Sequence, residues 1–406
     1  GASTAVFLAQ QGVRSVIVEK DAFPRFHIGE SMTGYCGGVV RAMGLEEHMQ
    51  SQGHPVKHGV TVYGTSGKNT FWVPVMSRGA SGELEDYSTW QVRRSTFDKE
   101  ALKAAKKAGS EIVTGQATEV LRNADGSVGG IMVRTPRGET IRIESKVVVD
   151  SSGMATFLSN AGVAGTKERG KYDRQLAMFS HLRGAAREPG KARGNTLIFY
   201  ANKNHWAWLI PIEDDVVSVG VVVPSNHFRE QKLDRETFYR RQLKQLNPEL
   251  ALRVKDVELV EPVRAASNYS YQVRNFTGKG FLCVGDAHRF VDPIFSFGLH
   301  FAVTEGQLAA EAIGDYLRRD GQGFGNNPFA LYEEVCERGM DAIEDMVDCF
   351  WLNPLAFSFF VHQKFRDDLI DLFAGRVYEQ PPNPGLVAIR AAKASALAKL
   401  QEQAAH

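Results

Sequence analysis

Cysteine is scarce in this chain, and its placement excludes several classes of protein. The four cysteines among 406 residues include no Cys-x-x-Cys pair and no metal-ligand spacing. We therefore expect free thiols, no metal site and a reducing, cytoplasmic location. No apolar run approaches the roughly 18 residues of a membrane-spanning helix. Charge of one sign is also lacking, since 48 Lys and Arg balance 47 Asp and Glu. We expect neither nucleic acid nor a membrane as a partner.

The sequence also lacks a complete glycine-rich fingerprint for a dinucleotide. In that fingerprint, G-x-G-x-x-G, the glycines precede a helix, and an acidic residue about 20 positions later binds the ribose hydroxyls. Here a helix rich in small residues follows Gly1, and a strand-like run ends at Glu19. Gly1 fits the last glycine and Glu19 fits the acid. We expect the first strand and the earlier glycines to lie before Gly1.

Residues 281–302 carry the most specific pattern in the chain. The apolar run 281–284 predicts a short strand covered on both faces, and Asp286 follows it as a potential acceptor for sugar or ribityl hydroxyls. Gly298 has no Cβ, so a flat ring can approach the backbone closely. The amides of Gly298 and Leu299 would point out of the helix that begins there, and such a terminus favours negative charge. This pattern predicts a cofactor clamp.

The spacing of Phe290, Pro293, Ser296 and Gly298 is similar to the F-x-x-P-x-x-S-x-G pattern of flavin-dependent halogenases. These enzymes belong to the FAD-dependent hydroxylase-fold superfamily, whose aromatic hydroxylases usually carry G-Q-G at this point. The resemblance implies FAD, used as FADH2, with Pro293, Gly298 and Leu299 against it. It also implies a halide, chloride or bromide, near Ser296 and Gly298.

Two further segments resemble cofactor-binding parts of this superfamily. In residues 23–31, FPRFHIGES, Arg25 would pair with the pyrophosphate and Gly29 would allow close approach. Ser31 could instead cap the helix that follows.

Residues 89–102 match a V-x-R-x-x-F-D segment, which implies Arg94 near the pyrophosphate or adenine and Gln91 near the flavin edge. The alternative for Arg94 is an ion pair with Asp98 or Glu100 at the start of a helix. Ser95 or Thr96 would cap that helix.

Lys57 lies in residues 54–64, HPVKHGVTVYG, which predict a strand or a strand edge. The segment resembles the one that carries the catalytic lysine of halogenases, so the resemblance implies Lys57 in that role. Burial would lower the pKa of a lysine and make its amine nucleophilic. The alternative is a solvated surface lysine, which is the common case.

Trp206 and Trp208 fall in residues 205–211, HWAWLIP, within a region of antiparallel strands. Two positions apart on a strand, both side chains face the same side, and Ala207 faces the other. The segment resembles the W-x-W-x-I-P motif of halogenases, where the two rings are a barrier between substrate and flavin. An aromatic core strand is the simpler reading, and a related segment occurs in geranylgeranyl-reductase-type flavoproteins.

Together these patterns predict an α/β fold. It would comprise an FAD-binding parallel-sheet, Rossmann-like domain, an interleaved antiparallel substrate layer and a helical, Phe-rich C-terminal cap. The predicted boundaries are 1–53, 90–165 and 265–325 for the FAD domain, 54–89 and 166–264 for the antiparallel layer, and 326–406 for the cap.

The resemblance implies a flavin-dependent halogenase of natural-product biosynthesis. FADH2, O2 and halide would give hypohalous acid, which would pass through a tunnel to Lys57 and halogenate a phenolic, pyrrolic or indolic ring, free or on a carrier protein. The acidic residue that indole-halogenating relatives place near the lysine is not identifiable. No second nucleotide fingerprint appears, so a separate NAD(P)H-dependent flavin reductase is an expected partner. The alternatives are an FAD-dependent monooxygenase, a geranylgeranyl-reductase-like flavoprotein and a non-catalytic flavin-binding protein.

Overall fold

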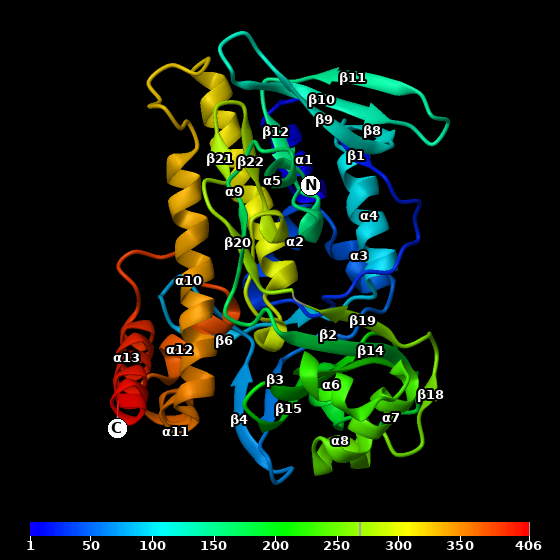
Figure 1. Ribbon diagram of the computed structural model, residues 1–406, viewed down its shortest axis with the longest axis vertical. Coiled ribbons are helices and arrows are strands. Elements are labelled where there is room, and N and C mark those ends of the chain that lie inside the picture. The colour runs from blue at the N-terminus through cyan, green and yellow to red at the C-terminus, as the bar shows by residue number, and fades with distance from the viewer. Residues whose placement is uncertain (268, 406) are drawn as a thin grey trace.

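The computed structural model describes residues 1–267 and 269–405 as an α/β protein. Figure 1 shows upright helices beside short strands in the upper half, and a sheet that crosses below them. The helices are α1 (Ala2–Gln10), α2 (Gly34–Ala42), α3 (Glu46–Ser51), α4 (Arg94–Lys107), α5 (Phe157–Asn160), α6 (Ser225–Gln231), α7 (Arg235–Gln245), α8 (Pro248–Arg253), α9 (Gly298–Arg318), α10 (Ala330–Leu352), α11 (Pro354–Phe359), α12 (Arg366–Ala374) and α13 (Pro384–Ala405).

Two pairs of parallel strands lie in the upper half, where the sequence predicts a parallel sheet. β1 (Val16–Glu19) pairs with β8 (Glu111–Thr114), and β12 (Val148–Asp150) pairs with β22 (Phe281–Cys283). All three residues of β22 are buried, which is what an unbroken apolar run predicts for a strand covered on both faces. β21 (Thr277–Gly278) adds an antiparallel partner to β22.

Small residues let α1 lie close against α9. The Ser3 hydroxyl donates to the Val303 carbonyl at 2.7 Å, and a Cβ on Gly306 would come within 3.0 Å of Ser3. Because α9 begins at Gly298, this close packing fixes the direction in which the predicted cofactor clamp opens.

A large sheet forms the lower half, in the strand order β18-β14-β17-β16-β15-β3-β4, with β19 beside β14. It is antiparallel except at one place, where β15 and β3 run in parallel with Thr196 opposite Val60. The predicted antiparallel layer thus contains one parallel pair, because β3 joins β15 from far along the chain and no hairpin sets its direction. The strands are β3 (Gly59–Tyr63), β4 (Asn69–Pro74), β14 (Gln175–Arg183), β15 (Thr196–Asn202), β16 (His205–Pro211), β17 (Val216–Pro224), β18 (Glu258–Leu259) and β19 (Arg264–Ser267).

Both faces of this sheet are buried. On one face Trp206 and Trp208 pack in a core that includes Phe295 and Phe350. On the other face Ala207 packs in a core with Phe238 of α7. The sequence therefore predicted correctly that the tryptophans share a face and Ala207 opposes them.

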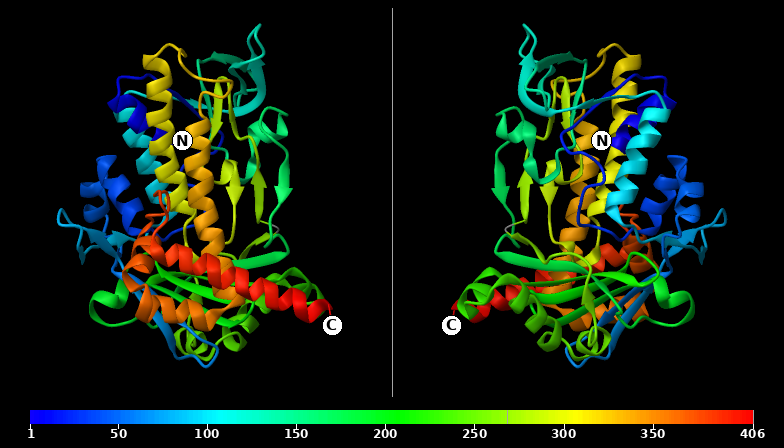
Figure 2. Two further views of the ribbon diagram at one scale, coloured as in Figure 1. Left: turned by 90° about the vertical axis from the view of Figure 1, so that its left-hand side faces the viewer. Right: turned by 90° about the vertical axis from the view of Figure 1, so that its right-hand side faces the viewer.

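The C-terminal segment is helical and aromatic, as expected. Phe295 and Phe357 stack with ring centroids 5.9 Å apart, and the Phe373 ring meets Phe295 edge-on at 5.1 Å. In Figure 2, α13 lies across the lower part of the molecule and ends at its side. None of the described helices has the length and apolarity to cross a membrane. The domain boundaries stay a prediction.

The remaining elements are short. An antiparallel insertion of three strands stands at the top of Figure 1. It contains β9 (Gln116–Arg122), β10 (Val128–Arg134) and β11 (Thr140–Glu144). The other strands are β2 (Val56–Lys57), β5 (Met76–Arg78), β6 (Leu84–Asp86), β7 (Thr89–Trp90), β13 (Lys167–Arg169), β20 (Tyr271–Val273) and β23 (Arg289–Phe290). The single turns are η1 (Gly153–Ala155), η2 (Gly190–Gly194), η3 (Gly285–Ala287), η4 (Pro293–Phe295) and η5 (Phe360–Lys364).

Asp348 on α10 ties the C-terminal helices to the large sheet. It is 8% exposed and accepts a hydrogen bond from the Tyr172 hydroxyl at 2.5 Å. Lys171 and Lys393 lie 2.8 and 2.7 Å from the same carboxylate. Burial raises the pKa of Asp348, but the hydrogen bonds from Lys171, Lys393 and Tyr172 outweigh burial, so the net shift is downward.

We predict that Asp348→Asn lowers the free energy of unfolding by about 2 kcal/mol at pH 7, because it removes charge from three hydrogen bonds. A lowered folded pKa gives stability that is present above the unfolded pKa and is lost as the pH falls. The deficit should therefore shrink below pH 4. Urea unfolding at pH 7 and pH 3.5 measures it, with Asp367→Asn, an exposed carboxylate on α12, as the control. Equal deficits at both pH values would contradict the assignment.

Candidate active site

Lys57 points into the protein from β2. Its residue is 3% exposed, and its ammonium donates to the Ser31 hydroxyl at 2.8 Å and to the Met32 carbonyl at 2.9 Å. Among the described residues it forms no ion pair with a carboxylate. Burial therefore lowers the pKa of Lys57 from 10.5 to about 7. The expected desolvation is confirmed, and the catalytic role stays a prediction.

The N-terminus of α9 is open where the sequence predicts the cofactor clamp. Phe297 precedes the helix and supplies no side-chain cap. A Cβ built on Gly298 would meet no atom within 4 Å, although the helix packs closely further on. Ser296 has a left-handed backbone, with φ at 61°. A non-glycine residue held in that region is uncommon, and it marks a loop that the surrounding structure forces into shape.

Asp286 lies in η3, directly after the buried strand β22. Within the described part of the chain its carboxylate accepts no hydrogen bond, whereas its carbonyl accepts one from the Tyr271 hydroxyl. Burial raises the pKa of Asp286 to about 7, against the charge of Arg94. A partly buried carboxylate without a donor suits the hydroxyls of a ribityl chain. Together with the open terminus of α9, it fits FAD.

The segment 27–31 is held by Arg94. The guanidinium donates to the carbonyls of Ile28 and Gly29 at 2.9 and 3.0 Å, and to Asp98 at 2.7 Å. The alternative of a helix-start ion pair with Asp98 is thus confirmed. Gly29 has φ at 97°, and a Cβ there would come within 3.3 Å of Arg94. The contacts of Gly29 and Arg94 with FAD stay predictions.

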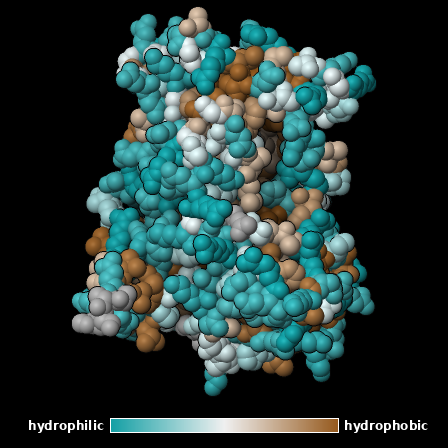
Figure 3. Space-filling view, viewed as in Figure 1, coloured by the Kyte–Doolittle hydropathy of each residue, from teal (hydrophilic) through white to brown (hydrophobic). Residues whose placement is uncertain are grey.

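Arg25, Gly1 and Glu19 lie around α1 and β1, and their contacts with FAD stay predictions. Arg25 pairs with Asp98 at 3.1 Å and with Glu19 at 3.7 Å. Glu19 ends β1. Gly1 precedes α1 and lies so close to Ser151 that a Cβ built on Gly1 would be 2.6 Å from the Ser151 hydroxyl oxygen. White and brown residues line a hollow in Figure 3, at the place where Figure 1 shows the N-terminus between α2 and α4.

Ser31 is part of the lysine site and caps no helix. Thr33, not Ser31, caps α2, and α4 begins after Arg93 without the predicted cap from Ser95 or Thr96. The Ser31 hydroxyl lies 2.9 Å from that of Thr196. The Gln91 amide donates to the same Thr196 hydroxyl at 2.9 Å. Gln91 is thereby linked to Lys57 through two hydroxyls, and its contact with the flavin edge stays a prediction.

The two tryptophans are buried side by side. Their ring centroids are 5.8 Å apart, and the Trp208 indole nitrogen donates to Ser218 at 3.1 Å. They share a core with Ile294, Phe295 and Phe297 from the loop that precedes α9. The aromatic core strand is thus observed, and the function of the pair as a barrier stays a prediction.

Comparison with known proteins decides the family. A family model described as tryptophan halogenase matches residues 68–355. The chain is 35% identical to a 1H-pyrrole-2-carbonyl-[peptidyl-carrier protein] brominase of Pseudoalteromonas luteoviolacea, over 93% of this chain and 90% of that one. It is 28% identical to the corresponding chlorinase of Pseudomonas fluorescens, over 93% and 87%. The solved structure of the flavin-dependent brominase Bmp2 is 34% identical, with a TM-score of 0.90 over 98% of this chain and 96% of that one.

The chain belongs to the flavin-dependent halogenases. It is an FADH2-dependent enzyme that uses FAD and a halide, as the sequence predicts.

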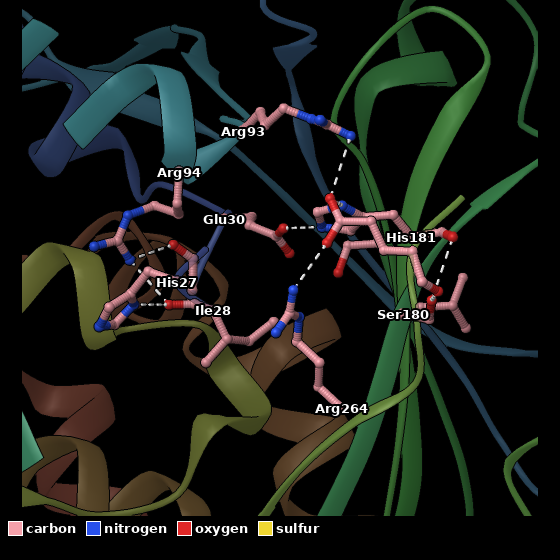
Figure 4. A network of polar contacts seen from close by, with 12 residues as sticks. His27, Ile28, Glu30, Arg93, Arg94, Ser180, His181 and Arg264 are labelled. Atoms are coloured by element: carbon pink, nitrogen blue, oxygen red, sulfur yellow. Dashed lines mark hydrogen bonds and ion pairs between the residues drawn. The ribbon is translucent and has the colours of Figure 1, made fainter. Parts of the chain in front are cut away.

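The halogenase has a buried charge network that the sequence did not reveal. The His181 imidazole lies 2.6 Å from Glu30 and 3.1 Å from Glu261, one carboxylate at each ring nitrogen. Burial lowers the pKa of His181, but Glu30 and then Glu261 outweigh burial, so the pKa is raised. In Figure 4 His181 points from the sheet toward Glu30, with Arg93 and Arg264 nearby. A histidine inside an apolar strand was the available signal.

We predict that Gly298→Ala leaves the fold of the halogenase intact and weakens FAD binding at least about tenfold, since a methyl has room in the protein but would occupy the place predicted for the flavin. Fluorescence titration with FAD measures the affinity, and urea unfolding measures the stability. Gly325→Ala is the matched control, because a Cβ there also meets nothing within 4 Å. Unchanged FAD affinity in Gly298→Ala would contradict the predicted cofactor clamp.

Proposed function

We propose that this halogenase halogenates a pyrrole-2-carbonyl group attached to a peptidyl carrier protein, with Lys57 as the residue that handles the electrophilic halogen. Two relatives that each match over 93% of the chain, a brominase and a chlorinase, both carry that substrate in their names. The observation that carries the role of Lys57 is its buried ammonium, which has two neutral hydrogen-bond acceptors and no described counter-charge.

A lowered pKa gives Lys57 the form that the chemistry requires. When bound, FADH2 would give two electrons to O2, and the oxygen so activated would oxidise halide to hypohalous acid, with FAD and water as the other products. A neutral amine attacks the halogen of that acid, so that an N–halogen bond forms, the O–halogen bond breaks and water leaves with the amine proton. With an ordinary pKa of about 10.4, fewer than one lysine in 10³ is neutral at pH 7. With a pKa of about 7, roughly half of Lys57 is neutral.

The remaining site residues have supporting roles in this proposal. FAD would be held by Gly1, Glu19, Arg25, Gly29, Gln91, Arg94, Asp286, Pro293, Gly298 and Leu299. The open start of α9 offers the amides of Gly298 and Leu299 to negative charge, and the halide would lie near Ser296 and Gly298. The buried pair of Trp206 and Trp208 would keep the substrate from the flavin.

Electrons would come from a separate NAD(P)H-dependent flavin reductase, because the sequence has no second nucleotide fingerprint. The four cysteines are buried and free, which supports a reducing, cytoplasmic location.

We predict that Lys57→Met and Lys57→Arg both lose at least about 10³ of the halogenation rate and bind FAD as the wild type does, since neither side chain offers a neutral amine. The assay supplies a flavin reductase, O2, bromide or chloride and the pyrrolyl-carrier thioester, and mass spectrometry counts halogenated product. Lys106→Met, on the exposed face of α4, is the control. Substantial halogenation by Lys57→Met would contradict the assignment, and activity in Lys57→Arg alone would favour a role as a charged donor.

We predict that the single-turnover rate, started with reduced flavin, rises between pH 6 and pH 8 with an apparent pKa near 7. The direction follows from the neutral amine, whose population increases as Lys57 loses its proton. Rapid-quench measurement of halogenated product gives the profile without the reductase. A rate that instead falls through this range would mean that the ammonium is the active form.

A further inference from the structure

A cavity of about 220 Å³ lies behind the strand that carries Lys57. Pro55, Val56 and His58 line it, whereas the Lys57 side chain turns to the opposite face of β2. The cavity is closed on another side by η2, which presses so closely on β2 that a Cβ on Gly194 would meet the Val56 carbonyl at 2.1 Å. Whatever occupies this cavity lies one strand away from the buried amine.

The cavity is lined by more positive than negative charge. Arg187, Lys191 and Arg193 line it, with Asp214 as the single acidic lining residue. Arg187 donates to the Val216 carbonyl at 2.9 Å, and Arg193 donates to the Asp214 carbonyl at 3.0 Å, so these two cations use neutral acceptors. Lys191 makes no hydrogen bond or ion pair with any residue that the structure describes.

Neighbouring acids offset the positive charge of the cavity only in part. Glu213 pairs with Arg93 at 2.8 Å, and Asp215 pairs with Arg183 at 2.7 Å. Burial lowers the pKa of Arg187 and the adjacent Arg193 lowers it further, whereas Asp214 and Asp215 raise it without outweighing them. Cations gathered without matching carboxylates suit an anionic ligand, and guanidinium groups suit phosphate in particular.

The size of the cavity limits what it can hold. At about 220 Å³ it is smaller than the pockets of roughly 300–1,000 Å³ that enclose whole ligands. It therefore suits one phosphate with a few attached carbons. Pro55 and Val56, the latter 42% exposed, give an apolar wall beside the cations.

We propose that this cavity binds the phosphate of the phosphopantetheine arm that carries the substrate. The inference rests on the proposed function, because only a carrier-bound substrate brings such an arm. Lys191 and Arg193 pair with the phosphodiester, and Pro55 and Val56 contact the adjoining methyl groups. The charges set the affinity for the arm and leave the reaction at Lys57 unaltered.

The test compares two small substrates, the pyrrole-2-carbonyl thioesters of phosphopantetheine and of pantetheine, which differ only in the phosphate. For the wild type we expect kcat/KM to be at least about tenfold higher with the phosphate. For Lys191→Glu/Arg193→Glu the ratio should fall to about one. The control Lys106→Glu, on an exposed face of α4, should keep the wild-type ratio. Lys191→Arg should also keep it, because it preserves the charge.

Turnover of the complete pyrrolyl-carrier protein separates the two proposals. If the wild type halogenates neither the complete pyrrolyl-carrier protein nor either thioester, the proposed substrate is wrong, and so is this inference. A wild type that halogenates the carrier but shows no preference for phosphate overturns the inference alone. The inference is also overturned if Lys191→Glu/Arg193→Glu no longer halogenates the carrier-bound substrate but keeps the preference for the phosphate thioester. The cations would then contact the carrier protein itself.

Discussion

The centre of the structure holds a buried ammonium, Lys57, for which the described residues supply no counter-charge. Moving a charged amine out of water is costly unless a partner compensates. Here the Lys57 ammonium has only the Ser31 hydroxyl and the Met32 carbonyl. The cost is reduced by losing the proton, which is why the pKa falls to about 7. Burial costs free energy, but it also leaves part of the Lys57 amine neutral, and therefore nucleophilic, near pH 7.

The segment from His27 to Thr33 carries this constraint to the rest of the structure. Three parts of the fold hold it: Arg94 at the start of α4, His181 on β14 and Lys57 on β2. Their side chains reach it from opposite directions, as Figure 4 shows for Arg94 and His181. The segment is therefore fixed between the parallel strands and the large sheet. Ser31 in this segment contacts the Lys57 amine, and Gly29 in the same segment is a predicted contact of the flavin. One short piece of chain therefore carries a residue of each site.

Much of this arrangement could be predicted from the sequence, and the reasons differ by element. The strand before Asp286 and the open helix at Gly298 follow from local patterns, an apolar run and a glycine at a helix start. The shared face of Trp206 and Trp208 follows from the period of a strand. The parallel pairing of β3 with β15 has no local signal, and neither has the contact between Glu30 and His181, 151 residues apart. The alternative of Ser31 as a helix cap is wrong, and no local signal links Ser31 to Lys57, which is brought to it only by tertiary structure.

The position of Lys57 on so short a strand would let the proposed chemistry and the proposed binding of the arm take place on opposite sides of β2. Residues that alternate along β2 face opposite sides, so Lys57 points into the core while Val56 and His58 face the cationic cavity. A positive charge on the amine side would raise the cost of protonating Lys57 further. Placing the cations behind the backbone keeps them away from the acceptors at Ser31 and Met32. An anion can then bind on the other side of β2 without entering the water-excluded surroundings of Lys57, on which its lowered pKa depends.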